Sequence, residues 1–148
     1  MSTPLIYLAT PAYGGLVTTS YMLSIVRLIG AAPELGFDTT LNLLGKDSLV
    51  TRSRNTLVAH FLSIADATHM MFIDADIGFA PEQVARMLAL DEDVVAGMYP
   101  LKTFRWDQAE TVGAGEPLET GLLHYVGQFC ERSEIEMRDG FEIGRAHV

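Results

Sequence analysis

The sequence predicts an α/β protein whose mostly parallel sheet is flanked by helices. One observation is a set of short apolar runs, each about as long as one strand, near residues 5–9, 38–43, 69–73 and 93–99. Another is that the stretches between these runs place apolar residues at helical spacing. Strands that alternate with helices along a chain form parallel sheets through crossover connections. We therefore expect four strands joined by three helices.

The first part of the chain contains two of these strands and the helix between them. The run 5–9 is followed by a loop rich in proline and glycine at residues 10–15, which ends the first strand. Residues 18–29 carry apolar side chains at helical spacing, and the hydroxyl residues at their start are able to cap a helix. Gly36 ends this region, and residues 37–44 then alternate in part, as a second strand does.

A second helix is predicted over residues 48–65, because its apolar residues fall on one face. They are Leu57, Val58, Phe61, Leu62 and Ala65. Arg52 and Arg54 lie in its early turns, where the helix dipole favours acidic side chains. A local preference that is broken without visible compensation points to function.

The third and fourth strands enclose the last predicted helix. The third strand covers residues 69–73, and Pro81 then suits the first position of a helix. The apolar stripe of that helix consists of Val84, Met87 and Leu88. Beyond the fourth strand at 93–99, glycines interrupt every candidate element, and residues 122–129 are a further candidate strand.

Length, charge and cysteine content exclude several classes of protein. With 148 residues the chain has the size of one domain, and 49% hydrophobic residues are enough for a substantial core. The formal net charge of −9 argues against sequence-independent binding to nucleic acid, which needs a surplus of Lys and Arg. Cys130 is the single cysteine, which excludes an internal disulfide and a cysteine-based zinc site.

Targeting signals are also lacking in the sequence. No segment approaches the roughly 18 apolar residues that span a bilayer, and the N-terminus lacks the basic and apolar regions of a signal peptide. We therefore expect a cytoplasmic protein without a transmembrane segment.

Charge is distributed unevenly along the chain. Residues 1–106 carry ten acidic and seven basic side chains, whereas residues 107–148 carry nine acidic and three basic ones. We predict a single domain over 1–148, with a regular core over 1–104 and an acidic, less regular segment over 105–148. A solvated acidic surface would explain the same charge pattern.

The most informative motif is Asp74-Ala75-Asp76, which follows an apolar run at residues 70–73. Residues two apart in a strand point to the same side, so both carboxylates are able to converge on one point. Open α/β sheets bind their ligands at the carboxyl ends of strands, where this pair falls. Carboxylate oxygens suit Mg²⁺ or Mn²⁺, and such ions keep positions open for substrate phosphates. The alternative is that both aspartates only end the strand and cap a turn.

These features together resemble the family 2-type glycosyltransferases of the A-type fold. The similarity covers about residues 3–104 and rests on four stretches: Pro-x-Tyr after the first strand, Arg-x-Arg-Asn in the second helix, Asp-Ala-Asp-Ile followed by Pro-Glu-Gln-Val, and Val-Val-Ala-Gly-Met-Tyr-Pro-Leu-Lys at the fourth strand. The resemblance implies a Rossmann-like nucleotide-diphospho-sugar transferase (GT-A) fold. It further implies metal-dependent transfer of a sugar from a nucleoside-diphosphate sugar to an acceptor that the sequence does not identify.

The resemblance also assigns residues to the cation and the nucleoside. Asp76 would bind Mn²⁺ or Mg²⁺ directly, and Asp74 would bind it through water or lie near the ribose. Thr10, Pro11 and Tyr13 would form the nucleoside pocket, with Tyr13 stacking on the base. The alternative for these three residues is an ordinary strand-to-helix loop with a core tyrosine.

Two basic residues are assigned to the phosphates in the same way. Arg54 would bind a phosphate oxygen through its planar guanidinium, and Lys102 is a further candidate. The alternative for Arg54 is an ion pair at the surface.

The last third of the chain departs from the family pattern. Family members take acceptor-binding elements and, when inverting, a catalytic carboxylate from segments after the fourth strand. Val148 comes early for a complete acceptor half, so we expect a fold truncated at its C-terminus. The catalytic base is unassigned, because spacing does not select among Glu110, Glu116, Glu131 and Glu134.

Two other classes of protein remain open. A nucleotide-sugar-binding module or fragment without turnover would account for the short, acidic C-terminal third. A haloacid dehalogenase-like phosphatase also has an apolar run that ends in Asp-x-Asp. In that class the motif follows the first strand, whereas here it follows the third.

Overall fold

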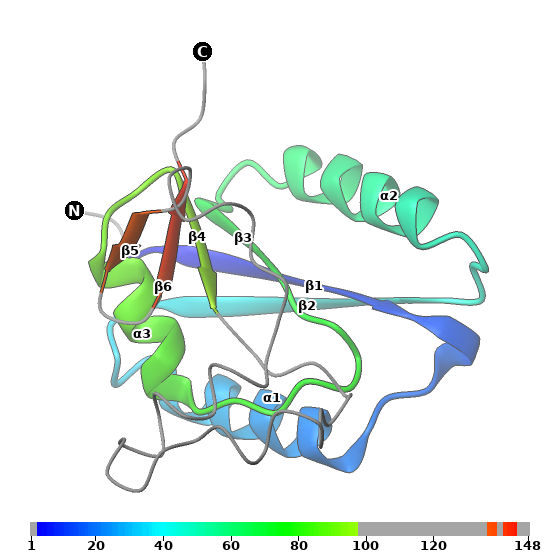
Figure 1. Cartoon of the computed structure of the whole chain (residues 1–148), viewed down its shortest axis with the longest axis horizontal. Coiled ribbons are helices and arrows are strands. Elements are labelled where there is room, and N and C mark those ends of the chain that lie inside the picture. The colour runs from blue at the N-terminus through cyan, green and yellow to red at the C-terminus, as the bar shows by residue number, and fades with distance from the viewer. Residues whose placement is uncertain (1–2, 98–135, 139–140, 145–148) are drawn as a thin grey trace, which may run out of the picture. The chain divides into compact units, whose positions relative to one another are not determined.

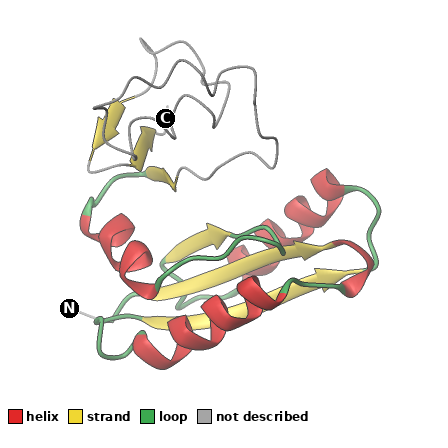
Figure 2. Cartoon of the chain, turned by 60° about the horizontal axis from the view of Figure 1, so that its bottom comes forward, coloured by secondary structure: helices red, strands yellow, loops and turns green. Residues whose placement is uncertain are grey.

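The first of two compact units contains a parallel sheet covered by helices. The computed structural model describes residues 3–97, 136–138 and 141–144, and the chain divides into the units Met1–Arg86 and Met87–Val148. The sheet of the first unit has the order β2-β1-β3, in which β1 is Leu5–Ala12, β2 is Asp38–Gly45 and β3 is His69–Phe72. Both pairings are parallel. The predicted α/β class, with a parallel sheet flanked by helices, is confirmed (Figure 1 and Figure 2).

The central strand β1 is buried on both faces, as expected for a strand of a covered parallel sheet. On one face, Tyr7 and Ala9 form a core with Leu57 of helix α2 (Val50–Ser63), and the Tyr7 ring lies 5.9 Å from that of Phe61. Alternation along the strand turns Ile6, Leu8 and Thr10 to the other face. Helix α1 (Thr19–Ala31) covers that face and buries Tyr21, Ile25 and Leu28.

The two connecting helices lie on opposite sides of the sheet (Figure 1). The chain runs from β1 through α1 to β2 at one edge, then through α2 to β3 at the other edge. The strand order therefore reverses between β1 and β3. In open α/β sheets this reversal opens a crevice at the carboxyl ends of the two strands.

Helix positions agree with the apolar stripes in the sequence. Helices α1 and α2 cover most of the predicted ranges 18–29 and 48–65. Helix α3 (Pro81–Ala89) begins at the predicted proline, and the Ala80 amide donates a 2.8 Å hydrogen bond to Oε1 of Gln83. That bond satisfies an amide which the first helical turn leaves unpaired.

The strand predicted over residues 93–99 does not extend the parallel sheet, and this part of the prediction is wrong. Strand β4 (Val94–Gly97) pairs antiparallel with β6 (Phe141–Gly144), which also pairs antiparallel with β5 (Glu136–Arg138). These strands form the sheet β4-β6-β5 of the second unit. A short apolar run indicates a buried strand, but it does not encode the direction of the partner strand.

Among the helices of the described residues, none has the length and apolar character that crossing a membrane requires. The candidate strand at 122–129 lies outside the described residues, as does Cys130.

Candidate functional site

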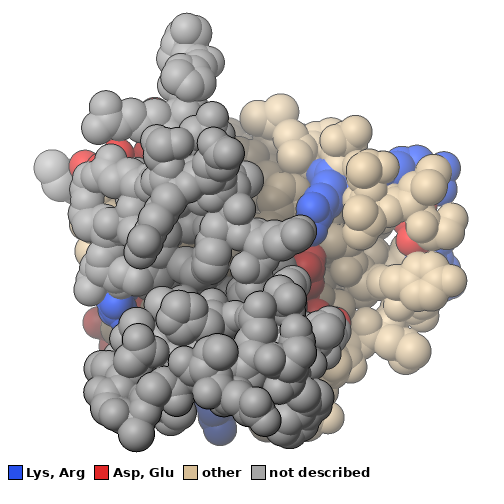
Figure 3. Space-filling view, viewed as in Figure 1, with Lys and Arg blue, Asp and Glu red and all other residues tan. Residues whose placement is uncertain are grey.

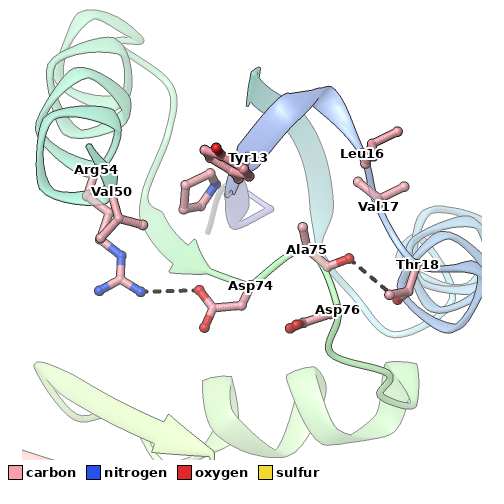
Figure 4. A pocket seen from close by; sticks show the side chains of 10 residues that line it. Tyr13, Leu16, Val17, Thr18, Val50, Arg54, Asp74, Ala75 and Asp76 are labelled. Atoms are coloured by element: carbon pink, nitrogen blue, oxygen red, sulfur yellow. Dashed lines mark hydrogen bonds and ion pairs between the residues drawn. The ribbon is translucent and has the colours of Figure 1, made fainter. Parts of the chain in front are cut away.

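A pocket of about 430 Å³ opens at the carboxyl ends of β1 and β3. Four segments line it: the end of β1 and its loop, the start of α1, the start of α2, and the loop after β3 (Figure 4). The lining residues are Pro11, Tyr13, Leu16, Val17, Thr18, Val50, Arg54, Asp74, Ala75 and Asp76. The pocket therefore lies where the strand order reverses, which is the usual ligand position in open α/β sheets.

Both aspartates of the Asp-x-Asp motif line this pocket, but they do so from a turn. Strand β3 ends at Phe72, and the amide of Ile77 donates a 3.1 Å hydrogen bond to the Asp74 carbonyl, which closes a turn over 74–77. The strand geometry predicted for the two carboxylates is thus wrong, whereas the predicted position at the strand end is correct. The turn still brings Asp74 and Asp76 to one pocket (Figure 4).

Thr18 attaches the aspartate turn to the start of α1. Its amide donates a 2.9 Å hydrogen bond to the carbonyl of Ala75, between the two aspartates. Its hydroxyl oxygen caps the helix by accepting a 3.3 Å bond from the amide of Tyr21. The buried Ser24 hydroxyl accepts a second bond, 2.8 Å long, from the amide of Phe79. The sequence predicts a capping hydroxyl at this position, but nothing in it indicates the partner of Thr18 in the turn.

Arg54 contacts the aspartate turn from the opposite side of the pocket. Its Nη2 lies 3.2 Å from Oδ1 of Asp74, and its guanidinium carbon lies 5.6 Å from the centre of the Phe72 ring. The ring and the carboxylate together hold the guanidinium at the pocket wall. The two side chains of the ion pair are 45% and 40% exposed, so the contact is open to solvent. Arg54 therefore forms an ion pair, and that pair lies within the candidate site.

The neighbouring arginine has a separate partner. Arg52 forms two hydrogen bonds to Asp47, of 2.8 Å from Nε and 2.6 Å from Nη2. These bonds, together with a backbone bond from Leu49, lower the pKa of Asp47 from 3.8 to about 2. Asp47 thereby compensates the basic start of α2, which has no acidic residue in its first turn. In Figure 3, basic and acidic atoms of the described residues likewise lie beside each other on the visible face.

Tyr13 lies on the loop after β1 and is 79% exposed, so it is not a core tyrosine. It begins a single helical turn, Tyr13–Gly15, in which both glycines have positive φ values of 67° and 74°. A Cβ atom added at Gly45 of β2 would lie only 3.2 Å from the Gly15 Cα. The close approach of these glycines fixes the loop against the sheet, and the aromatic ring stays at the pocket mouth.

Among the remaining predicted site residues that the structure describes, one lines the pocket and one does not. Thr10 is fully buried and its hydroxyl is 2.6 Å from that of Tyr21, so the core holds its side chain away from the pocket. Pro11, the next residue, lines the pocket, and its contact with a nucleoside stays a prediction. Lys102 and the candidate bases Glu110, Glu116, Glu131 and Glu134 lie outside the described residues.

The donor set of the pocket fits a divalent cation that shares its coordination with a ligand. Within the described residues, no three His, Cys, Asp or Glu side chains come together as a metal site. Two carboxylates in a solvent-open pocket match the way Mg²⁺ and Mn²⁺ are held, by one or two carboxylates with waters and substrate phosphates. Asp74 and Asp76 are the residues that would hold such an ion.

Comparisons with protein-family models, with curated proteins and with solved structures give no match to this chain.

Proposed function

We propose that this chain is a metal-dependent glycosyltransferase that moves a sugar from a nucleoside-diphosphate sugar to an acceptor. The observation that carries the proposal is the composition of one pocket. Two carboxylates, an arginine and an exposed aromatic ring line it, and it lies where the strand order reverses. A nucleoside diphosphate needs these three kinds of partner, because it combines a flat base with a strongly charged diphosphate. The sequence resemblance to family 2-type glycosyltransferases supports the same reaction and a GT-A fold.

Each pocket residue has a role in this proposal. Asp76 and Asp74 hold the cation, and Arg54 binds a phosphate oxygen through its planar guanidinium. Tyr13 stacks on the base, and Pro11 contributes to the wall of the nucleoside pocket. Thr18 positions the aspartate turn through its bond to Ala75. Lys102 stays a candidate for the phosphates.

The reaction requires stabilisation of the leaving diphosphate. An acceptor hydroxyl forms a bond to the anomeric carbon, the bond from that carbon to the diphosphate oxygen breaks, and the hydroxyl proton passes to a base. A divalent cation, when bound, neutralises part of the charge that develops on the diphosphate. Arg54 adds a second positive charge, and the pocket residues hold the donor in place for attack.

A thermal-shift screen tests the proposal most directly. UDP, GDP, CDP and their sugars are added with and without Mn²⁺, and donor hydrolysis is measured on the same sample. A ligand at about a hundred times its Kd stabilises the native state by roughly 2.7 kcal/mol, so the correct base is distinguishable. We expect one base to raise the melting temperature, with Mn²⁺ enlarging the effect.

The same screen separates the alternatives. Binding without donor hydrolysis or transfer would indicate a nucleotide-sugar-binding module, for which the same pocket suffices. Hydrolysis of a generic phosphate ester would indicate the dehalogenase-like reaction instead. If no nucleotide shifts the melting temperature with or without Mn²⁺, the proposed function is wrong.

A further inference from the structure

Asp74 belongs to the proposed cation site, yet it already has a positively charged partner. The Arg54 guanidinium lies 3.2 Å from Oδ1 of Asp74 and reaches it from α2, a different element of the fold (Figure 4). Phe72 lies under the same guanidinium at 5.6 Å. Arg54 is therefore held at the position from which it neutralises one of the two carboxylates of the pocket.

A divalent cation bound to the Asp74 carboxylate would have the same sign of charge as the neighbouring Arg54 guanidinium. A cation and a guanidinium that share one carboxylate repel each other at close range, and both interactions weaken. A diphosphate removes this competition, because some of its oxygens accept hydrogen bonds from the guanidinium while others coordinate the cation. Arginine suits this exchange, since its fork binds carboxylate and phosphate with similar geometry.

The exposure of the pair makes such an exchange feasible. The Arg54 and Asp74 side chains are 45% and 40% exposed, so no core packing has to be broken when the guanidinium moves. Exposed ion pairs of this kind are weak, and a ligand phosphate is a competitive partner.

We propose that Arg54 is a resident counter-ion of Asp74 in the ligand-free protein, and that it weakens the binding of a divalent cation until a diphosphate draws the guanidinium away. This inference rests on the proposed function, because it assigns the cation and the diphosphate to the same pocket. Its consequence is coupled binding: the diphosphate raises cation affinity, and the cation raises diphosphate affinity by the same factor. The site thus selects the cation–diphosphate complex over the free cation.

The test measures Mn²⁺ binding to the protein alone, by electron paramagnetic resonance titration, and repeats it with UDP, GDP, CDP and inorganic diphosphate. The variant is Arg54→Gln. The matched control is Arg52→Gln, which removes the same charge two residues away, where it pairs with Asp47 instead. We expect Arg54→Gln to bind Mn²⁺ alone about 2- to 10-fold more tightly than the wild type, on the scale of one lost exposed ion pair and its repulsion. The affinity of the Arg52→Gln control for Mn²⁺ alone should stay within about twofold of the wild type, because the Arg52 guanidinium does not contact Asp74.

The second readout is the enhancement of Mn²⁺ affinity by the diphosphate. It should be several-fold smaller in Arg54→Gln than in the wild type and the control. Arg54→Lys keeps the charge but lacks the fork, so its affinity for Mn²⁺ alone should match the wild type while its enhancement falls. Circular dichroism confirms that each variant is folded.

Two results would overturn the inference in distinguishable ways. If Arg54→Gln binds Mn²⁺ alone no more tightly than the wild type, and diphosphate-dependent binding persists, the competition is absent while the proposed function stands. If the wild type and Arg54→Gln bind no Mn²⁺ under any of these conditions, the metal-dependent function is wrong and the inference is wrong with it.

Discussion

The amide of Thr18 donates a 2.9 Å hydrogen bond to the carbonyl of Ala75, the residue between Asp74 and Asp76. Thr18 is also the N-cap of α1, so one residue joins the start of this helix to the aspartate turn. The two partners are 57 residues apart in the sequence. The position of both carboxylates therefore depends on how α1 begins, as well as on the local conformation of the turn.

Replacing Thr18 by Val tests this dependence. Valine has a similar shape but lacks the oxygen that accepts from the Tyr21 amide. Loss of an N-cap typically lowers the free energy of unfolding by about 0.5–2 kcal/mol, and urea denaturation measures this change. Hydrogen exchange at the Ile77 amide, which closes the aspartate turn, should become faster as well.

Two substitutions serve as controls for Thr18→Val. Thr18→Ser keeps the capping oxygen, so its free energy of unfolding should stay close to that of the wild type. Thr19→Val removes a hydroxyl from the next, exposed residue, which is not the cap. If Thr18→Val and Thr19→Val have the same stability, the hydroxyl of Thr18 does not support the helix start.

The Asp47–Arg52 ion pair predicts a pH dependence of stability. Arg52 lowers the pKa of Asp47 in the folded protein from 3.8 to about 2. A carboxyl group with a lowered folded-state pKa stabilises the protein above its ordinary pKa, and this contribution is lost as the pH falls from about 4 towards 2. We expect the stability difference between the wild type and Asp47→Asn to be constant from pH 5 to 7 and to shrink below pH 4. Urea denaturation across this range measures it, and an unchanged difference at pH 2.5 would contradict the assignment.

Much of the fold follows from periodicity. Apolar residues at helical spacing predicted α1, α2 and α3, because a helix that covers a sheet needs one continuous apolar face. Short apolar runs predicted β1, β2 and β3, because the strands of a covered parallel sheet are buried on both faces. The direction in which β4 pairs was not predictable, because it is set by a partner at Phe141–Gly144 and not by the residues of β4.

Part of the pocket lining was predictable from the sequence, but its detailed geometry was not. Because ligands bind at the carboxyl ends of parallel strands, the sequence predicted that Tyr13, Arg54 and Asp74 lie at one edge of the sheet. The three residues line one pocket. The bond from Thr18 to Ala75 depends on how α1 packs against a distant loop, and local sequence carries no signal for it. Thr10 does not line the pocket, because strand alternation turns its side chain into the core, where its hydroxyl contacts that of Tyr21.

Tyr13 offers a test of base recognition with little risk to the fold. Tyr13 is 79% exposed, so Tyr13→Ala should leave the free energy of unfolding nearly unchanged. Stacking of a base on an aromatic ring is worth about 1–3 kcal/mol when measured by alanine substitution, so nucleotide affinity should fall by about 5- to 150-fold. Isothermal titration calorimetry with the preferred nucleoside diphosphate measures the loss.

The controls for Tyr13 separate stacking from general apolar contact. Tyr13→Phe keeps the ring and should bind within about threefold of the wild type. Leu62→Ala removes an apolar side chain of similar exposure from α2, outside the pocket, and should leave nucleotide affinity unchanged. Equal affinities of Tyr13→Ala and the wild type would assign the base to another part of the chain.

Asp76 provides the most direct test of the proposed cation site. Asp76→Asn preserves the size of the side chain but removes the negative charge that a hard cation requires. The part of nucleotide binding that depends on Mn²⁺ should fall by at least about tenfold, which corresponds to ~1.4 kcal/mol, while binding without Mn²⁺ changes little. Asp66→Asn makes the same substitution at an exposed residue between α2 and β3, away from the pocket, and its nucleotide binding should match that of the wild type. Titrations of the three proteins with and without Mn²⁺ decide the point. If Asp76→Asn retains the full Mn²⁺ enhancement, the two aspartates only end the strand and shape the turn.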